Sequence, residues 1–199
     1  SFYYNSDDSF ELSAKPVYHD IYDISDGYLQ GAYIDFFDIN IKKEKDENIK
    51  LDRFTLLKIK SLAPRDMFFK PISWGIDLAY EHFKDQSDYF KVKPEAGISY
   101  GTSKDFIYLM FGSNVYYKQS DQLFSLGSSL GFVTNGFDNL KIGLEYSYDK
   151  YNKGLQNNQF EIFSTYKLDT NASLTLKYIN DDLYKDNKER IKAGIFYYF

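Results

Sequence analysis

The chain of 199 residues has the length of one domain that can enclose a substantial interior. Its 24 basic and 29 acidic side chains are scattered and give a formal net charge of −5, which provides no reason to expect nucleic-acid binding. Cysteine is absent, which excludes thiol catalysis and disulfides, and no stretch approaches the roughly 18 uninterrupted apolar residues of a helical membrane span.

Apolar residues alternate with polar or small ones along most of the chain, a period of two that is typical of β-strands with one apolar face. In chain order, such runs cover residues 2–4, 10–18, 32–36, 49–59, 74–80, 90–100, 107–117, 124–132, 140–148, 160–168, 174–178 and 190–199. The alternation changes phase near Phe37 and Asp38, which predicts a bulge there. Helical spacing is not sustained anywhere, so an all-β domain is expected.

The last run ends the chain on an apolar row. Counting back in twos from Phe199 gives Tyr197, Ile195, Ala193 and Ile191, whereas Arg190 and Lys192 lie between them. A strand of this kind, with an aromatic residue at the terminus, resembles the closing strand of a bacterial outer-membrane β-barrel. Because the closing strand of that class also acts as its assembly signal, Tyr197 and Phe199 are the residues expected to engage the barrel assembly machinery.

The number of strands follows from parity. Eleven runs are strong, but bacterial single-chain barrels have an even number of antiparallel strands. Residues 2–4, followed by a turn at residues 5–8, supply a twelfth strand. We therefore expect an up-and-down transmembrane barrel of about 12 strands, with 10 possible if one early run is a loop. We expect residues 1–199 to form this single domain, as the C-terminal part of a longer protein, in contact with outer-membrane lipids.

Parity also assigns the connections to the two ends of the barrel. If Phe199 lies at the periplasmic rim, residues 101–105, 135–139 and 169–171 form periplasmic turns, and residues 150–156 and 180–187 form external loops. Two longer segments, residues 20–30 and 62–71, then fall on the periplasmic side. Barrels usually have short turns on that side, so this departure requires a physical reason.

The orientation of the two strand faces separates a membrane barrel from a soluble one. A sandwich or a lipocalin-like barrel also has period two, but its apolar face points inward. Here the face opposite the apolar rows contains Lys91, Lys93, Glu95, Lys141, Glu145, Glu161, Lys177, Arg190 and Lys192. Aromatic residues such as Trp74 and Tyr100 recur at strand ends, as in the girdles of membrane barrels. Both features favour an apolar face toward lipid and a polar, side-chain-filled lumen.

Two segments carry a more specific resemblance. Pro16-Val17-Tyr18-His19-Asp20 precedes Gly31-Ala32-Tyr33-Ile34-Asp35-Phe36, and residues 61–74 read Ser-Leu-Ala-Pro-Arg-Asp-Met-Phe-Phe-Lys-Pro-Ile-Ser-Trp. Together they resemble the C-terminal region of Gram-negative proteins that contain an Lnb-like N-terminal periplasmic domain. The resemblance covers about residues 14 to 83. It implies a preceding periplasmic domain, related to one in a lipoprotein acyltransferase, whose catalytic residues would lie outside these 199 residues.

The second of these segments is the main candidate site. In a loop, the apolar residues at its centre predict either a surface that docks the preceding domain or a plug folded back into the barrel mouth. The candidate docking or plug residues are Pro64, Arg65, Asp66, Met67, Phe68, Phe69, Pro71 and Trp74. We therefore expect a membrane anchor and docking platform for a periplasmic domain.

Two alternative functions are a lipid-modifying enzyme at the rim and a narrow pore. The enzyme would use His19, oriented by Asp20, with a nucleophile such as Ser61 or Ser73. A histidine beside an aspartate is also common in polar networks, so we expect any catalysis in the preceding domain instead. The acidic pairs at residues 7–8 and 181–182 are typical of solvated loops, and no metal site or cofactor is expected.

Overall fold

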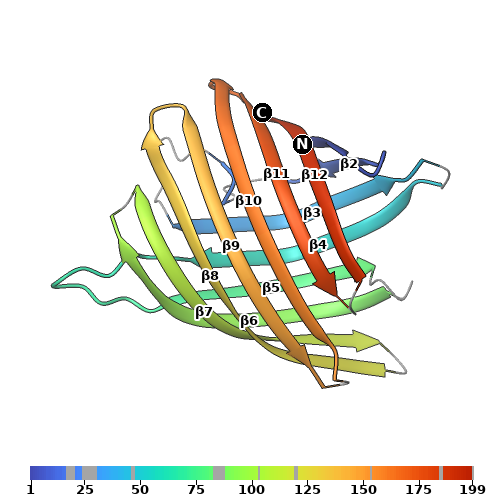
Figure 1. Ribbon diagram of the computed structural model, residues 1–199, viewed down its shortest axis with the longest axis horizontal. Coiled ribbons are helices and arrows are strands. Elements are labelled where there is room, and N and C mark those ends of the chain that lie inside the picture. Colours follow the sequence, from blue (N-terminus) through green and yellow to red (C-terminus); the bar gives the residue numbers. More distant parts are fainter. Residues whose placement is uncertain are drawn as a thin grey trace.

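The computed structural model describes residues 1–16, 21–23, 31–45, 48–82, 88–102, 104–118, 121–152, 154–183 and 186–198, without the side chains of residues 82, 121, 183, 186 and 187. Within these residues, twelve antiparallel strands form one closed barrel (Figure 1). Each strand pairs with the next along the chain, and β1 pairs with β12 to close the wall. The described part of the chain contains no helix with the length and apolar character of a membrane span.

The alternating runs of the sequence form the strands. They are β1 (Phe2–Asn5), β2 (Phe10–Ala14), β3 (Ala32–Lys43), β4 (Lys50–Ser61), β5 (Ser73–His82), β6 (Asp88–Gly101), β7 (Asp105–Lys118), β8 (Asp121–Phe137), β9 (Leu140–Tyr151), β10 (Gln156–Asp169), β11 (Ala172–Leu183) and β12 (Asp186–Tyr197). The expected number of twelve is confirmed, and so is the short first strand at residues 2–4.

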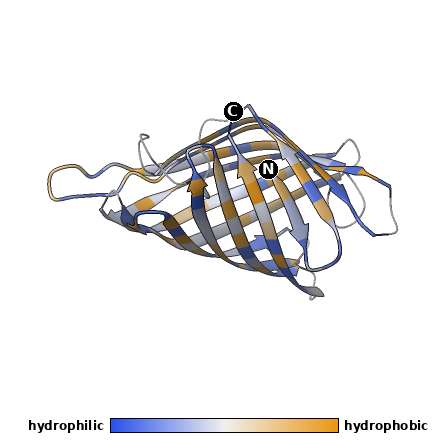
Figure 2. Ribbon diagram, turned by 90° about the horizontal axis from the view of Figure 1, so that it is seen from above, coloured by the Kyte–Doolittle hydropathy of each residue, from blue (hydrophilic) through white to orange (hydrophobic). Residues whose placement is uncertain are grey.

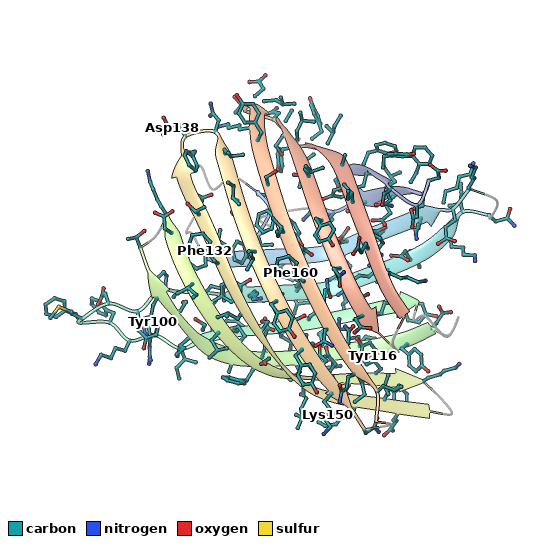
Figure 3. All side chains as sticks on the ribbon, in the orientation of Figure 1. Tyr100, Tyr116, Phe132, Asp138, Lys150 and Phe160 are labelled. Atoms are coloured by element: carbon teal, nitrogen blue, oxygen red, sulfur yellow. The ribbon has the colours of Figure 1, made fainter. Side chains whose placement is uncertain are left out.

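The two ends of the barrel carry different connections. Asp138 and Lys150 lie at opposite ends (Figure 3). We call the end with the turns at residues 102–104, 138–139 and 170–171 the terminal end, because β12 ends there, and the other end the distal end. The long connections at residues 15–31 and 62–72 are both at the terminal end, as parity predicted.

The wall has an apolar outer face and a polar inner face. Ile195 and Leu144 retain 52% and 37% of their accessible surface on the outside, whereas Lys141 points inward and is 0% exposed. Figure 2 shows the resulting alternation of hydrophobic and hydrophilic positions along the strands. The outer face also carries the expected aromatic residues near the strand ends, among them Trp74, Tyr80, Tyr100, Tyr117 and Tyr166. The expected orientation of the two faces is therefore confirmed.

Inward-facing glycines allow aromatic rings to lie flat against the wall. A Cβ added at Gly131 would lie 2.2 Å from the ring of Tyr108, and one at Gly143 would lie 2.1 Å from the ring of Phe163. Since real Cβ atoms do not approach so closely, only glycine fits beneath these rings. The rings fill the interior without pushing the strands apart.

Three details of the strands differ from, or refine, the sequence-based expectations. β2 ends at Ala14 and not at residue 18, because Pro16 has no N–H to continue the ladder; residues 17–20 lie outside the described part. The external loop expected at residues 180–187 is only residues 184–185, since β11 and β12 pair as far as Leu183 and Asp186. The phase change at Phe37 is confirmed: this residue has φ +51° and points outward like its neighbour Phe36.

Candidate functional site

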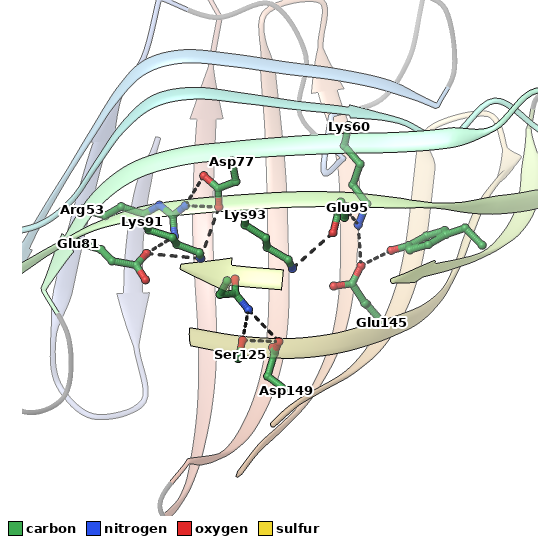
Figure 4. A network of polar contacts seen from close by, with 12 residues as sticks. Arg53, Lys60, Asp77, Glu81, Lys91, Lys93, Glu95, Ser125, Glu145 and Asp149 are labelled. Atoms are coloured by element: carbon green, nitrogen blue, oxygen red, sulfur yellow. Dashed lines mark hydrogen bonds and ion pairs between the residues drawn. The ribbon is translucent and has the colours of Figure 1, made fainter. Parts of the chain in front are cut away.

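A network of ion pairs crosses the middle of the lumen (Figure 4). Arg53 on β4 contacts Asp77 and Glu81 on β5, with N–O distances of 2.6 Å in each case. Lys91 on β6 lies 3.5 Å from Asp77 and 3.7 Å from Glu81. The side chains come from neighbouring strands because alternate residues of each strand point inward, so two carboxylates are neutralised by two cations.

A second group of charges lies beside the first one. The ammonium group of Lys60 is 3.2 Å from Glu145 and 3.6 Å from Glu95, and Lys93 is 3.5 Å from Glu95. The hydroxyl of Tyr108 donates a further hydrogen bond to Glu145. These contacts join strands on opposite sides of the interior and hold the lumen in one arrangement.

These charged residues border a cavity of about 320 Å³. The side chains of Arg53, Lys93 and Glu145 keep 28%, 29% and 35% of their accessible surface although they point inward. The middle of the lumen is therefore large enough and polar enough to hold several water molecules. The charges around it satisfy one another, so the cavity does not require a charged ligand.

The terminal half of the lumen is closed by part of the β2–β3 connection. Residues 21–23, which we call the plug segment, lie inside the barrel. The Tyr22 hydroxyl donates a 2.7 Å hydrogen bond to Glu161, and the Tyr22 ring packs edge-on against Phe163, with 4.8 Å between ring centroids. The ammonium group of Lys177 lies 3.1 Å from the centroid of the Tyr22 ring. This ring is thus held from β10 and β11 at once.

Asp23 fixes the other end of the plug segment. Its carbonyl oxygen accepts a 2.7 Å hydrogen bond from Lys141, and its carboxylate accepts a 2.6 Å hydrogen bond from the hydroxyl of Tyr198. Burial, and then the negative charge of Asp23, raise the pKa of Tyr198. The Tyr198 hydroxyl therefore remains a donor at neutral pH.

An apolar cluster surrounds the plug segment. Ile21 packs against buried inward-facing residues of β3, the β4–β5 loop, β7 and β8, namely Tyr33, Leu62, Phe106, Tyr108, Met110 and Val133. The backbone N–H of Leu62 also donates a 2.6 Å hydrogen bond to the carbonyl of Gly31, so the two long connections are joined at their roots. The terminal half of the lumen is consequently a packed core.

A second cluster lies toward the distal end. The inward-facing Tyr89, Tyr116, Leu123 and Tyr151 pack together on the neighbouring strands β6 to β9, and Leu155 packs against them. On the other side of the lumen, the Arg190 side chain of β12 keeps 28% of its accessible surface. The distal cluster therefore covers one side of the interior.

The β4–β5 loop, residues 62–72, extends beyond the terminal rim and has an apolar tip (Figures 1 and 2). Met67, Phe68 and Phe69 are 88%, 88% and 73% exposed. The Asp66 carboxylate accepts hydrogen bonds from the backbone N–H groups of Phe68 and Phe69, at 2.7 and 2.6 Å. The tip is thus a bent, hydrogen-bonded turn that displays its apolar side chains.

Arg65 stabilises the base of the same loop. Its guanidinium donates to the carbonyl oxygens of Pro71 and Lys70, at 3.2 and 3.3 Å, and its backbone N–H bonds to the carbonyl of Ser99 on β6. The motif residues Arg65 and Asp66 therefore shape the loop, while the residues after them form its surface. The exposed tip lies away from the lumen; the segment that enters the lumen comes from the other long connection.

The other expected site residues have mixed outcomes. His19, Asp20 and Phe199 lie outside the described residues, so the proposed histidine site stays a prediction, as does the assembly role of Tyr197 and Phe199. Tyr197 is 58% exposed on the outer face. Ser73 is fully buried, with its hydroxyl 3.0 Å from that of Ser99. Among the described residues, no group of His, Asp or Glu side chains is arranged to hold a metal ion.

Sequence reasoning missed the plug segment. The sequence indicates only that residues 20–30 form a connection longer than is usual for that end of the barrel. The pairing of Tyr22 with Glu161 joins residues 139 positions apart, and no local pattern encodes it. The predicted lumen positions of Lys141, Glu161 and Lys177 are confirmed, but the sequence does not show that all three contact the plug segment.

The fold is that of an outer-membrane β-barrel. The NanC porin has a TM-score of 0.60 at 9% sequence identity, over 100% of this chain and 98% of that protein. The KdgM porin gives 0.57 at 13% identity, over 100% and 97%. An outer-membrane channel from Pseudomonas putida F1 gives 0.54 at 12% identity, over 96% and 83%. At these identities the likeness concerns the fold alone. No curated protein sequence matches the chain.

The family follows from the sequence itself. Residues 2–198 match the family described as "Domain of unknown function (DUF7840)". Because the match spans nearly the whole barrel, the chain belongs to this family.

Proposed function

We propose that this barrel is a closed membrane anchor that positions a periplasmic domain of the same protein at its terminal end. The proposal rests on the exposed apolar tip of the β4–β5 loop. Three apolar side chains, Met67, Phe68 and Phe69, are exposed at its tip. The hydrogen bonds that Arg65 donates and that the Asp66 carboxylate accepts hold its shape. An exposed apolar surface on a pre-shaped loop is typical of a docking site.

The direction of β1 determines the end of the barrel at which a preceding domain would lie. Phe2 lies opposite Ile195 near the end of β12, and the amino group of Ser1 donates a 2.7 Å hydrogen bond to the carbonyl of Ser13. The chain therefore enters the wall from the terminal end. A domain joined before Ser1, as the resemblance to proteins with an Lnb-like domain implies, would lie at the same end as the β4–β5 loop.

The lengths of the connections favour this end as the functional one. Distal connections comprise residues 6–9, 44–49, 83–87, 119–120, 152–155 and 184–185, whereas the long ones, residues 15–31 and 62–72, are both terminal. In most outer-membrane barrels the long loops are external and the periplasmic turns are short. Long connections at the periplasmic end would offer a binding surface to a periplasmic partner, which would explain why the usual distribution is reversed here.

The two alternatives have less support. KdgM, one of the porins with this fold, was solved in complex with a disordered oligogalacturonate, but here the plug segment closes the lumen. We expect planar bilayers containing the unmodified barrel to show no conductance steps. A rim lipid hydrolase would depend on His19, and loss of lipid turnover in His19→Ala is the result that it requires.

The docking role is tested with the double variant Phe68→Asp/Phe69→Asp. The barrel and the periplasmic domain proposed to precede Ser1 are expressed as separate chains, and their association is measured by co-purification in detergent. We expect the variant to keep the heat-modifiable gel migration of a folded barrel but to lose most of its association. Desolvating two carboxylates in an apolar interface costs several kcal/mol.

A matched control is Lys104→Asp, which places a new carboxylate in the β6–β7 turn at the same end of the barrel. This variant is expected to bind as the unmodified barrel does. Equal association of all three proteins would eliminate docking through the β4–β5 loop. Codons upstream of Ser1 that encode no periplasmic domain would eliminate the proposed partner.

A further inference from the structure

We infer a further activity for this barrel: when the plug segment leaves the lumen, the barrel conducts small inorganic ions. The cavity in the middle of the lumen then becomes part of the conducting path, with residues 21–23 as its gate. This activity goes beyond the anchor role, and it does not depend on a docked domain.

The location of the dry zone supports the inference. Inward-facing Lys141 and Thr165 are 0% exposed, and Phe163 is 4% exposed, all in the terminal half near the plug segment. Farther along the lumen, Arg53 and Glu145 keep 28% and 35% of their side-chain surface. The interior is therefore sealed where residues 21–23 lie, and it has room for water in the middle.

The plug segment can leave without opening the wall. The barrel is closed by backbone pairing between consecutive strands and between β1 and β12, in which residues 21–23 take no part. The contacts described above attach these residues through wall side chains: Lys141, Glu161, Phe163, Lys177 and Tyr198. Ile21 adds apolar packing against the surrounding cluster. None of these contacts belongs to the strand ladder, so the segment can leave while the ladder stays intact.

Behind the plug segment, a polar path continues. The cavity of about 320 Å³ is lined by Tyr22 on one side and by Arg53, Asp77 and Lys91 farther in. Beyond it, the distal aromatic cluster occupies the β6 to β9 side and Glu11 on β2 is 4% exposed, whereas the Arg190 side chain on β12 keeps 28% of its surface. The conducting path is therefore inferred to pass beside Arg190. The cavity is lined by both cations and carboxylates, so it suits hydrated ions of either sign more than apolar solutes.

The experiment uses the whole barrel in planar lipid bilayers with KCl. The variant Tyr22→Ala/Lys141→Ala removes the ring that Phe163 and Lys177 hold and the donor to the Asp23 carbonyl. We expect it to show discrete conductance steps, which the unmodified barrel lacks. The matched control is Tyr116→Ala, which removes an inward-facing ring of the distal cluster and is expected to show no steps.

Heat-modifiable migration on gels reports whether each variant is folded. Steps in the unmodified barrel, no steps in the folded double variant, or equal steps in Tyr116→Ala would each overturn the inference. If the double variant does not fold, the single variant Tyr22→Ser, which retains the Lys141 hydrogen bond, is expected to show brief openings. Their absence in that folded variant would overturn the inference as well.

Discussion

The terminal half of the lumen and its middle belong to the same strands, but their interiors are built differently. In the terminal half, rings and an inserted chain segment exclude solvent, and Lys141 is completely buried against the Asp23 carbonyl. In the middle, ion pairs such as Arg53–Asp77 cross a cavity and remain partly exposed. The packed part of the interior and the charge-paired part should therefore respond differently to substitution.

The inward-facing residues of a membrane barrel therefore need not form one uniform polar lining. Glycine beneath a ring, as at Gly143 and Phe163, produces a core like that of a soluble protein. Paired charges instead keep the interior polar without leaving a free charge. The two parts of the interior can be compared through the free energy of unfolding in urea of the detergent-solubilised barrel and its variants. Unfolding is monitored by the fluorescence of the single tryptophan, Trp74.

The largest effect is expected in the middle, from Arg53→Met. This substitution leaves Asp77 and Glu81 without their closest cation. Lys91 remains within 3.7 Å and the site is partly exposed, so we expect a loss of about 3 kcal/mol, at the low end for a broken buried ion pair. An unfolding midpoint equal to that of the unmodified barrel would show that the ion pairs do not hold the middle together.

A smaller effect is expected in the terminal half, from Gly143→Ala. The new methyl group would meet the Phe163 ring at 2.1 Å and push it toward Tyr22 of the plug segment. Overpacking of this kind costs about 2 kcal/mol. Gly136→Ala is the control, because its Cβ would meet no atom closer than 3.3 Å. Equal stability of the two variants would contradict a packed terminal half.

The smallest effect is expected from Lys93→Met. Lys93 is 29% exposed and lies 3.5 Å from Glu95, which keeps Lys60 as a second partner at 3.6 Å. A partly exposed pair of this kind contributes less than about 1 kcal/mol. A loss as large as that of Arg53→Met would mean that the charges of the middle act as one indivisible unit.

Much of the fold could be predicted from the sequence because the wall of a barrel depends on the alternation of apolar and polar residues, which is a local pattern. Residue alternation gave the strands and the inward position of Lys141 and Glu145, and parity gave the twelfth strand and the placement of the long connections. The strand ends were less predictable. The pattern of β2 continues to residue 18, but Pro16 cannot donate to the ladder.

The site could be predicted only in part. The composition of residues 62–71 indicated an apolar loop, and its exposed Phe68 and Phe69 agree with that expectation. The choice between docking and plugging required tertiary contacts. Tyr22 has no local feature that distinguishes it from other loop tyrosines, and its role depends on Glu161, Phe163 and Lys177, which lie far away in the chain.

The central claim is that hydrocarbon covers the apolar rows while the alternate residues face a closed interior. The most direct measurement uses two variants in a Trp74→Phe background, Leu109→Trp and Tyr108→Trp, which place a single tryptophan on opposite faces of β7 at nearly the same depth. The quenching of its fluorescence by lipids with brominated acyl chains is then compared between the two variants. The account predicts strong quenching at residue 109, which faces outward, and little at residue 108, whose native side chain is 2% exposed. Quenching at residue 108 with protection at residue 109 would contradict it.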